Sequence, residues 1–309
     1  MPRRPSRPSW KRLAAVAVAC GLLTVAVFWT NVLGAGDRAE ALARRIELVI
    51  DPPPDRPIDE DVLVTPAPDE TLEATPAPTP AGTVQPSTGS EPPAEPTPTA
   101  TPLPKRTAVD VNLFTDPERR FITEIDHEWC AVAGTQMVLA AHGKAPLTED
   151  FQKVLAGRIG EWESRRDSHN GGWGPSAITK ALAAYGVDGY EVHVYETRAD
   201  ALRDAARAIE TTNAPVLLMA WRGAHTWVMT GFRADADPLV FADAKVSGTY
   251  VLDPWYPRDS SIWGQSDPPG TFQDQSEMRR NYLPWHRPEG NYAKRDGLFL
   301  AVVPTIPRN

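Results

Sequence analysis

Cys130, His225 and Asp253 are residues of the types that supply a thiol nucleophile, its base and the group that orients the base. Cys130 opens a helical pattern, and a helix N-terminus favours the thiolate and lowers the pKa of the thiol. His225 opens a strand pattern, and Asp253 follows a short apolar run. If these two strands are adjacent and antiparallel, Asp253 comes to lie beside His225. The set predicts nucleophilic chemistry, although each residue alone also has an ordinary structural explanation.

The use of cysteine supports a special role for Cys130. The chain has only one other cysteine, Cys20, which lies within an apolar N-terminal run. Once that run is inserted in a membrane the two cannot meet, so no intramolecular disulfide is available. A lone thiol is unusual in an oxidising compartment, where structural cysteines are normally paired.

Helical and strand patterns surround these residues. Three helices are predicted, at residues 130–142, 175–185 and 199–210. Strands are predicted at residues 215–221, 225–232, 250–252 and 298–303. Helices first and strands later indicate an α+β domain. Residues 254–288 are irregular and rich in Trp, Tyr and Pro, and a segment of that length is typical of a binding loop or lid.

Four sequence blocks resemble a known group of enzymes. They are HEWCAVAGTQMVLAAHG, GGWGPSAITKALAAYGV, GAHTWVMTGF and YVLDPW. They are similar to the conserved blocks of papain-like bacterial cysteine peptidases related to bacteriocin-leader-processing peptidases. The resemblance implies a papain-like fold in which the helix carrying the Cys packs on an antiparallel sheet carrying the His and Asp. It also implies that Cys130 is the nucleophile, His225 the general base and acid, and Asp253 the orienting residue.

Glu124 departs from the pattern of that group. Such enzymes usually have glutamine six residues before the cysteine, where its amide donates to the oxyanion. A carboxylate only accepts hydrogen bonds, and its charge opposes an oxyanion. Either Glu124 is held protonated, or His127 or Trp129 supplies the donor, or catalysis is weakened or lost. Loss of one such donor costs about 2.7 to 4 kcal/mol.

Three functions fit these residues. The first is a thiol hydrolase that cuts a peptide or amide bond through an acyl-enzyme on Cys130. The second is a transglutaminase-like acyl transferase, which uses the same three residue types and passes the acyl group to an amine. The third is a catalytically impaired papain-like binding module at the cell surface, as Glu124 suggests. The expected partners are a peptide, a protein or a cell-wall peptide.

The N-terminus predicts a single-pass membrane anchor. Residues 1–12 form a basic tail, and residues 13–35 are an uncharged apolar run long enough to cross a bilayer as a helix. The basic tail is expected to stay in the cytoplasm and the C-terminal domain to lie outside. A cleaved signal peptide or lipidation at Cys20 is the alternative, since either would also begin with an apolar run.

The remaining chain divides by composition. Residues 36–50 predict a short juxtamembrane helix. Residues 51–106 are predicted to be a disordered linker, because 16 of the 32 prolines and no aromatic residue fall between Pro52 and Pro104. Residues 107–309 are predicted to form the peptidase-like domain.

Several classes of function are disfavoured. The formal net charge is −8, and no basic stripe with interleaved aromatic residues points to nucleic acid. No dinucleotide or phosphate-binding glycine motif is present, since residues 171–174 are better interpreted as a loop before a helix. His127, Glu128 and Cys130 lack a second ligand set, so neither a metal nor a cofactor is expected.

Overall fold

The computed structural model describes residues 58, 60–65, 104–164, 166–168, 173–286 and 292–308. All of them belong to one compact unit, Arg56–Asn309. The predicted basic tail, anchor and juxtamembrane helix at residues 1–50 lie outside the described residues. Within the described part, no helix is both long enough and apolar enough to cross a bilayer.

Helices and strands alternate along the described chain. The helical elements are η2 (Glu118–Arg120), α3 (Cys130–Ala141), α4 (Glu149–Gly157), α5 (Ile159–Trp162), α6 (Pro175–Ala184), α7 (Arg198–Thr212), η3 (Trp221–Gly223) and α8 (Gln275–Asn281). The strands are β1 (Val62–Leu63), β2 (Val109–Asn112), β3 (Tyr190–Tyr195), β4 (Val216–Ala220), β5 (His225–Ala234), β6 (Val246–Leu252), β7 (Asp259–Ser260), β8 (Gly264–Gln265), β9 (Thr271–Asp274) and β10 (Phe299–Pro304). The expected α+β class is confirmed.

A mostly antiparallel sheet organises the domain. Seven strands follow the order β1-β3-β10-β4-β5-β6-β9, and β2 pairs with the second half of β5. The pairing of β5 with β6 is antiparallel, as predicted, with Val228 opposite Leu252. β1 runs parallel to β3 and adds residues 62–63, which the sequence places in the linker, to the sheet. β7 and β8 form a separate hairpin.

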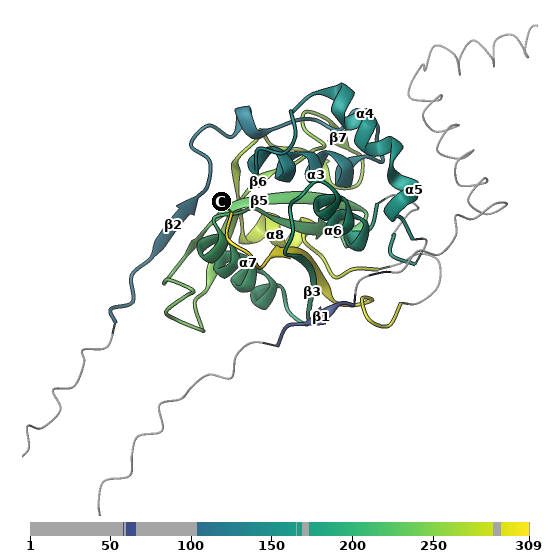
Figure 1. The fold of residues 1–309 in the computed structure, drawn as a ribbon. Helices are drawn as coiled ribbons and strands as arrows, with labels where there is room; N and C mark the ends of the chain where they lie inside the picture. The colour runs from purple at the N-terminus through teal and green to yellow at the C-terminus, as the bar shows by residue number, and fades with distance from the viewer. Residues whose placement is uncertain are drawn as a thin grey trace, which may run out of the picture. The chain divides into compact units, whose positions relative to one another are not determined.

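The sheet is covered on both faces (Figure 1). One core contains residues of α3, α4 and α6, and the other contains residues of α7 and α8. Side chains alternate between them along β4, because successive residues of a strand point to opposite faces: Leu217 and Met219 join the first core, and Val216 and Leu218 join the second. This arrangement places the N-terminus of α3 above the beginning of β5.

The segment predicted to be an irregular loop is more ordered than expected. Residues 254–288 contain the β7–β8 hairpin, strand β9 at the end of the main sheet, and helix α8. Asp274 caps α8, since its Oδ1 accepts from the backbone N–H groups of Ser276 and Glu277. The short strands here lack the long apolar run on which the other strand predictions depend.

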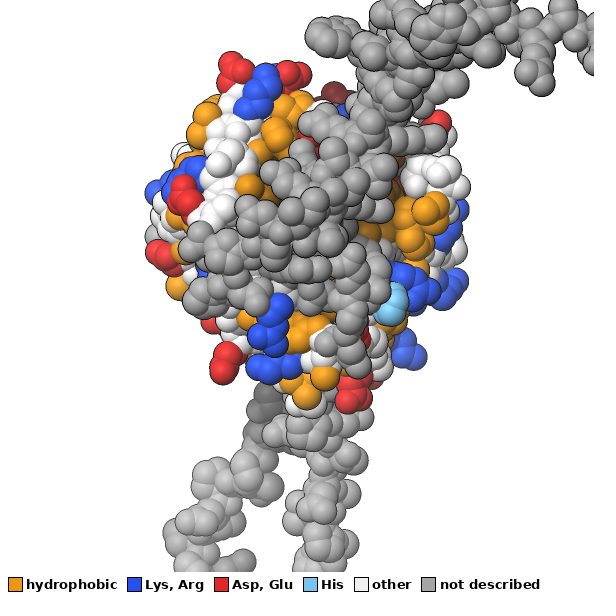
Figure 2. Space-filling view, turned by 90° about the vertical axis from the view of Figure 1, so that its right-hand side faces the viewer, with side chains coloured by type: hydrophobic (Ala, Val, Ile, Leu, Met, Phe, Trp, Pro, Cys, Tyr) orange, Lys and Arg blue, Asp and Glu red, His pale blue; other side chains and the backbone are white. Residues whose placement is uncertain are grey.

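Charged side chains are mixed on one face of the molecule. Figure 2 shows Lys and Arg side chains interspersed with Asp and Glu on the visible described surface. Such a mixture is typical of a solvated protein surface.

Candidate active site

Cys130 is the first residue of α3, as predicted. The helix can lie close to the sheet because small residues follow the cysteine. At Gly134, an added Cβ would lie 3.2 Å from the Thr226 side chain and 3.4 Å from that of Leu217. This close approach brings the N-terminal end of α3 to the start of β5. The backbone N–H of Cys130 has no acceptor within its own helix, because the first N–H groups of any helix lack one.

His225 is the residue that faces this cysteine. The Cys130 sulfur, a ring nitrogen of His225 and a carboxylate oxygen of Glu124 all lie within 4.8 Å of one another. The sulfur is also 3.9 Å from the carbonyl oxygen of Ala224, the residue before the histidine. Cys130 as a whole is partly exposed. A small movement therefore suffices to bring the thiol into hydrogen-bond reach of the ring.

Asp253 lies behind the histidine. Nε2 of His225 is 2.7 Å from Asp253 Oδ1, and the backbone N–H of Trp255 donates to the same oxygen at 2.9 Å. An ionised carboxylate only accepts hydrogen bonds, so Nε2 carries the proton of the neutral imidazole. Nδ1 is then the nitrogen able to receive the proton of a thiol. Both side chains are buried, with 2% of His225 and 7% of Asp253 exposed.

Tryptophan rings hold the imidazole in place. Trp221 stacks on His225 with ring centroids 4.0 Å apart, and Trp263, from the β7–β8 turn, stacks on the Trp221 ring at 5.7 Å. The turn that carries Trp221 needs Gly223, which has a φ of 90°. A Cβ there would also lie 2.1 Å from the Trp285 ring. Nothing in the sequence indicates the stacking of these rings.

Glu124 is fully buried in this cluster. Its Oε1 lies 3.4 Å from Nη1 of Arg258, and its Oε2 has no hydrogen-bond partner in the described part of the chain. Burial raises the pKa of Glu124 well above its usual value. The charge of Arg258 lowers this pKa, and the charges of Asp253 and Asp126 raise it. The protonated form, one of the possibilities raised by the sequence, is therefore favoured.

The pKa of the Cys130 thiol differs from the sequence prediction. A helix N-terminus predicts a lowered pKa, but the pKa of Cys130 is raised. Burial of the sulfur is the main cause, and the negative charge of Glu124 is the second. Hydrogen bonds from Thr226 and Ala131 oppose the shift without cancelling it. Desolvation outweighs the helix dipole here, and the thiolate needs a positive partner to form.

His127 and Trp129, the alternative oxyanion donors named from the sequence, pack against other residues. His127 is exposed, and its ring packs edge-on against Trp255 with centroids 5.2 Å apart. Trp129 is partly buried and packs against the core beneath α3. A side-chain oxygen of Glu124 lies within 4.8 Å of the sulfur.

Two residues of the site carry no signal that sequence reasoning could have used. Arg258 follows Glu124 by 134 positions. Gln152 on α4 accepts from the backbone N–H of Ile125 at 2.8 Å and so fixes the segment that carries Glu124. Both are ordinary polar residues in the sequence, and only the fold gives them this role.

The cluster of Glu124, Cys130 and His225 contains atom types that also occur in zinc sites. Among the residues described the group offers three ligands, which is too few for a structural zinc site and is the number found in catalytic zinc sites. The guanidinium of Arg258 lies against Glu124 and opposes a further cation. The group therefore fits a thiol, its base and an oxyanion position better than a metal centre. His127 and Glu128, which stand near Cys130 in the sequence, are not members of this group.

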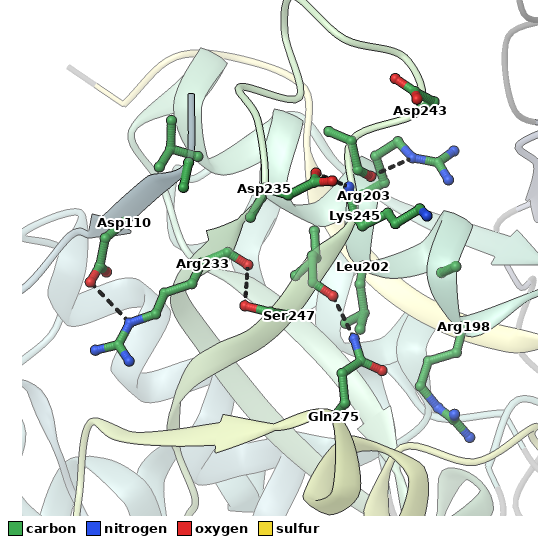
Figure 3. A pocket seen from close by; sticks show the side chains of 16 residues that line it. Asp110, Arg198, Leu202, Arg203, Arg233, Asp235, Asp243, Lys245, Ser247 and Gln275 are labelled. Carbon is green, nitrogen blue, oxygen red and sulfur yellow. Dashed lines mark hydrogen bonds and ion pairs between the residues drawn. The ribbon is translucent and has the colours of Figure 1, made fainter. Parts of the chain in front are cut away.

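A cavity lies on the other face of the sheet. It measures about 1100 Å³ and is lined by residues of β2, α7, β5 and β6 (Figure 3). Its polar side chains mostly bind one another or the backbone: Arg233 donates to Asp110 at 2.9 Å, and Gln275 donates to the carbonyl of Val246. No cysteine or histidine is among its lining residues. The volume of this cavity would make it a candidate active site, but the residue types that can do nucleophilic chemistry are at Cys130.

The fold and this cluster define a papain-like cysteine peptidase domain. A helix presents the cysteine, and the adjacent antiparallel strands present the histidine and the aspartate, as the sequence resemblance implies. The model of the Peptidase_C39-like family matches residues 116–283, more than half of the chain. The chain therefore belongs to that family. Neither the comparison with curated proteins nor that with solved structures gives a match.

Proposed function

We propose that the domain is a thiol hydrolase that cleaves a peptide or amide bond of a peptide, protein or cell-wall peptide. One observation carries the proposal: the sulfur of Cys130 and a ring nitrogen of His225 lie within 4.8 Å, with Asp253 2.7 Å behind the ring. A thiol, an imidazole and a carboxylate in this sequence of contacts form the general apparatus of nucleophilic acyl transfer.

The reaction follows from these positions. Nδ1 of His225 takes the thiol proton, and the sulfur attacks the carbonyl carbon. The backbone N–H of Cys130, at the helix N-terminus, donates to the oxyanion. The imidazolium then protonates the leaving amine as the C–N bond breaks, which leaves an acyl-enzyme on sulfur. Water attacks this thioester with His225 again as base, and the carboxylic acid product leaves as the thiol is restored.

Asp253 contributes by orientation and charge. Its Oδ1 holds the Nε2 proton of His225, so the ring presents Nδ1 to the sulfur. The negative charge also stabilises the imidazolium that forms when the thiol is deprotonated. The imidazolium matters because burial raises the pKa of the Cys130 thiol. Its ion pair with the thiolate offsets the free-energy cost of forming a buried thiolate.

The test is substitution of Cys130 with mass mapping of a thiol reagent. Wild-type protein should hydrolyse a peptide library and should react selectively with a cysteine-protease inhibitor at Cys130. Cys130→Ala should abolish both. Turnover by Cys130→Ala equal to that of wild type would exclude the mechanism.

A binding module without turnover is the second candidate. The raised pKa of Cys130 and the carboxyl group at the oxyanion position favour it. It predicts that iodoacetamide modifies Cys130 no faster than a free model thiol at neutral pH. Rapid and selective modification supports the hydrolase.

We further propose that the domain is tethered outside the cytoplasm by residues 13–35. The length of this apolar run and the preceding basic residues support the proposal. Membrane fractions should retain the full chain after a high-salt wash, and protease added to spheroplasts should remove the domain. Recovery of the full chain in the soluble fraction of lysed cells would contradict the tether.

A further inference from the structure

We propose that Glu124 acts as a neutral carboxylic acid, whose Oε2–H donates a hydrogen bond to the oxyanion formed on the scissile carbonyl. The inference rests on the proposed hydrolase function and assigns Glu124 a role that a carboxylate cannot fill. The acid is not consumed, because its proton stays on Oε2 while the oxyanion forms and collapses. Glu124 thus serves as a hydrogen-bond donor rather than as a proton-transfer group.

The backbone around Glu124 is held from two sides. The N–H of Glu124 donates to the carbonyl of Pro254 at 3.0 Å. On the other side, Gln152 accepts from the N–H of Ile125 at 2.8 Å and donates to the carbonyl of Thr123 at 3.2 Å. These bonds fix both neighbours of Glu124. Its carboxyl group is therefore positioned in advance, as an oxyanion donor must be.

The two carboxyl oxygens have different surroundings. Oε1 faces Arg258, whereas Oε2 is buried and has no partner in the part of the chain that the structure describes. A buried oxygen without a partner costs free energy, and the cost is larger for a charged group than for a neutral one. One oxygen of the Glu124 carboxyl group lies within 4.8 Å of the Cys130 sulfur, so the group with the unpartnered oxygen stands beside the nucleophile.

The groups that face Glu124 favour its neutral form. Arg258 is the one cation among the charged groups that act on it; it lies 3.4 Å away, and 27% of its side chain is exposed. Asp253 and Asp126 both repel a charge on Glu124. Cys130 and His225 are further titratable groups, each with an atom within 4.8 Å of a Glu124 oxygen. Burial together with two carboxylates outweighs the single guanidinium, and the pKa of Glu124 is raised well above its usual value.

The neutral acid also assists the nucleophile. The charge of Glu124 is the second cause of the raised pKa of Cys130, after burial. Protonation of Glu124 removes that repulsion, so the thiolate–imidazolium pair forms more readily. Ionisation would remove the O–H donor and make the thiolate harder to form at the same time. Activity should therefore fall as the pH rises through the pKa of Glu124.

The first test compares pH profiles of kcat/KM for wild type, Glu124→Gln and Glu124→Ala. Wild type should lose activity about tenfold per pH unit above the pKa of Glu124. Glu124→Gln has a permanent N–H donor and should lack this alkaline limb. Glu124→Ala should be about a hundredfold or more below wild type at acidic pH. Glu149→Gln, the same change at an exposed position on α4, is the matched control and should keep the wild-type profile. Identical profiles for wild type and Glu124→Gln, with an alkaline fall in both, would overturn the proposal.

The second test needs no turnover. In the purified chain labelled with ¹³C at the glutamate carboxyls, the signal lost in Glu124→Gln identifies Glu124. Its chemical shift should report a protonated carboxyl at neutral pH, and it should change only at higher pH, or not at all. A signal of an ionised carboxylate at neutral pH would overturn the inference even if the enzyme is active. A protonated Glu124 in a chain without turnover or Cys130 labelling would instead show that the hydrolase proposal has failed.

Discussion

Asp167 and Glu124 are both fully buried carboxyl groups, but their surroundings differ. Asp167 has a complete set of partners. Its Oδ2 accepts from the N–H groups of Ser176 and Ala177 at the start of α6, and its Oδ1 pairs with the guanidinium of Arg295. Glu124 has one contact of 3.4 Å, which its Oε1 makes with Arg258, and its Oε2 has no hydrogen-bond partner in the described part of the chain.

The region around Asp167 stabilises the fold. Arg295 is itself fully buried, and it binds Asp61 through two bonds of 2.8 Å. This ion pair joins residues 234 positions apart and holds the segment that contains β1 against the domain. Gly174 is required here, because a Cβ at that position would lie 2.4 Å from the carboxylate of Asp167. The backbone N–H groups at the start of α6 and the guanidinium of Arg295 together satisfy the charge of Asp167.

The difference separates a structural charge from a functional one. A buried carboxylate is tolerated when it is paired and hydrogen-bonded. Asp167 meets that condition. Glu124 meets it only in part, so burial drives it toward the neutral form and leaves one buried oxygen without a partner in the described part of the chain. We therefore expect substitutions at Asp167 to affect stability and substitutions at Glu124 to affect activity and its pH dependence.

Asp167→Ala should have the largest effect on stability. It leaves Arg295 with one carboxylate instead of two and removes the acceptor of the first N–H groups of α6. Breaking a buried pair from one side typically costs about 3 to 5 kcal/mol. Urea unfolding of the full chain measures the difference. Asp188→Ala, at an exposed position, is the control and should change the free energy by less than about 0.5 kcal/mol. Equal values for the two variants would remove the structural role assigned to Asp167.

Asp61→Ala should have an intermediate effect. The variant takes away the two bonds to Arg295 but leaves Asp167 as its partner, so a loss of about 1.5 to 3 kcal/mol is expected. Hydrogen exchange gives a local readout, because the N–H of Val64 donates to the carbonyl of Val194 at 3.1 Å. This amide should exchange faster in the variant. The exchange rates of the β5 amides should change only as far as the global stability changes. Unchanged protection of Val64 would show that β1 is held without the ion pair.

Local patterns in the sequence were enough to predict the main scaffold. The helices at 130–142, 175–185 and 199–210 correspond to α3, α6 and α7 within a few residues, because each has a clear apolar periodicity and a turn residue at its end. The predicted strands correspond to β4, β5, β6 and β10. The antiparallel pairing of β5 with β6 then places Asp253 at His225. The catalytic roles of these residues remain predictions.

Long-range pairs and burial could not be predicted in the same way. Asp61 stands in a proline-rich, acidic stretch whose composition indicates a linker, and its partner is Arg295 near the other end of the chain. The strand β3 and the helix α4 lack an apolar signal as long as those of their neighbours and were not predicted. The pKa of Cys130 moves opposite to the prediction because the helix N-terminus is visible in sequence and desolvation is not.

Glu124→Gln should have the smallest effect on stability at acidic pH, and that effect should grow as the pH rises. The pKa of Glu124 in the folded chain lies above the value of about 4.5 expected when it is exposed. Between these two values the folded state holds a proton that the unfolded state has released. The stability of wild type therefore falls as the pH rises through this interval. Glutamine has nearly the same shape and does not titrate, so the variant lacks this loss.

The measurement is urea unfolding of wild type and Glu124→Gln across a series of pH values. Below about pH 4.5 both side chains are neutral in both states, and the two proteins should differ by less than about 1 kcal/mol. Above it, the difference should grow in favour of the variant until the pH passes the folded pKa of Glu124, and then level off. Glu149→Gln should show no such growth, since Glu149 is exposed. A constant difference between wild type and Glu124→Gln at all pH values would mean that the guanidinium of Arg258 compensates the buried charge, and Glu124 would then resemble Asp167 after all.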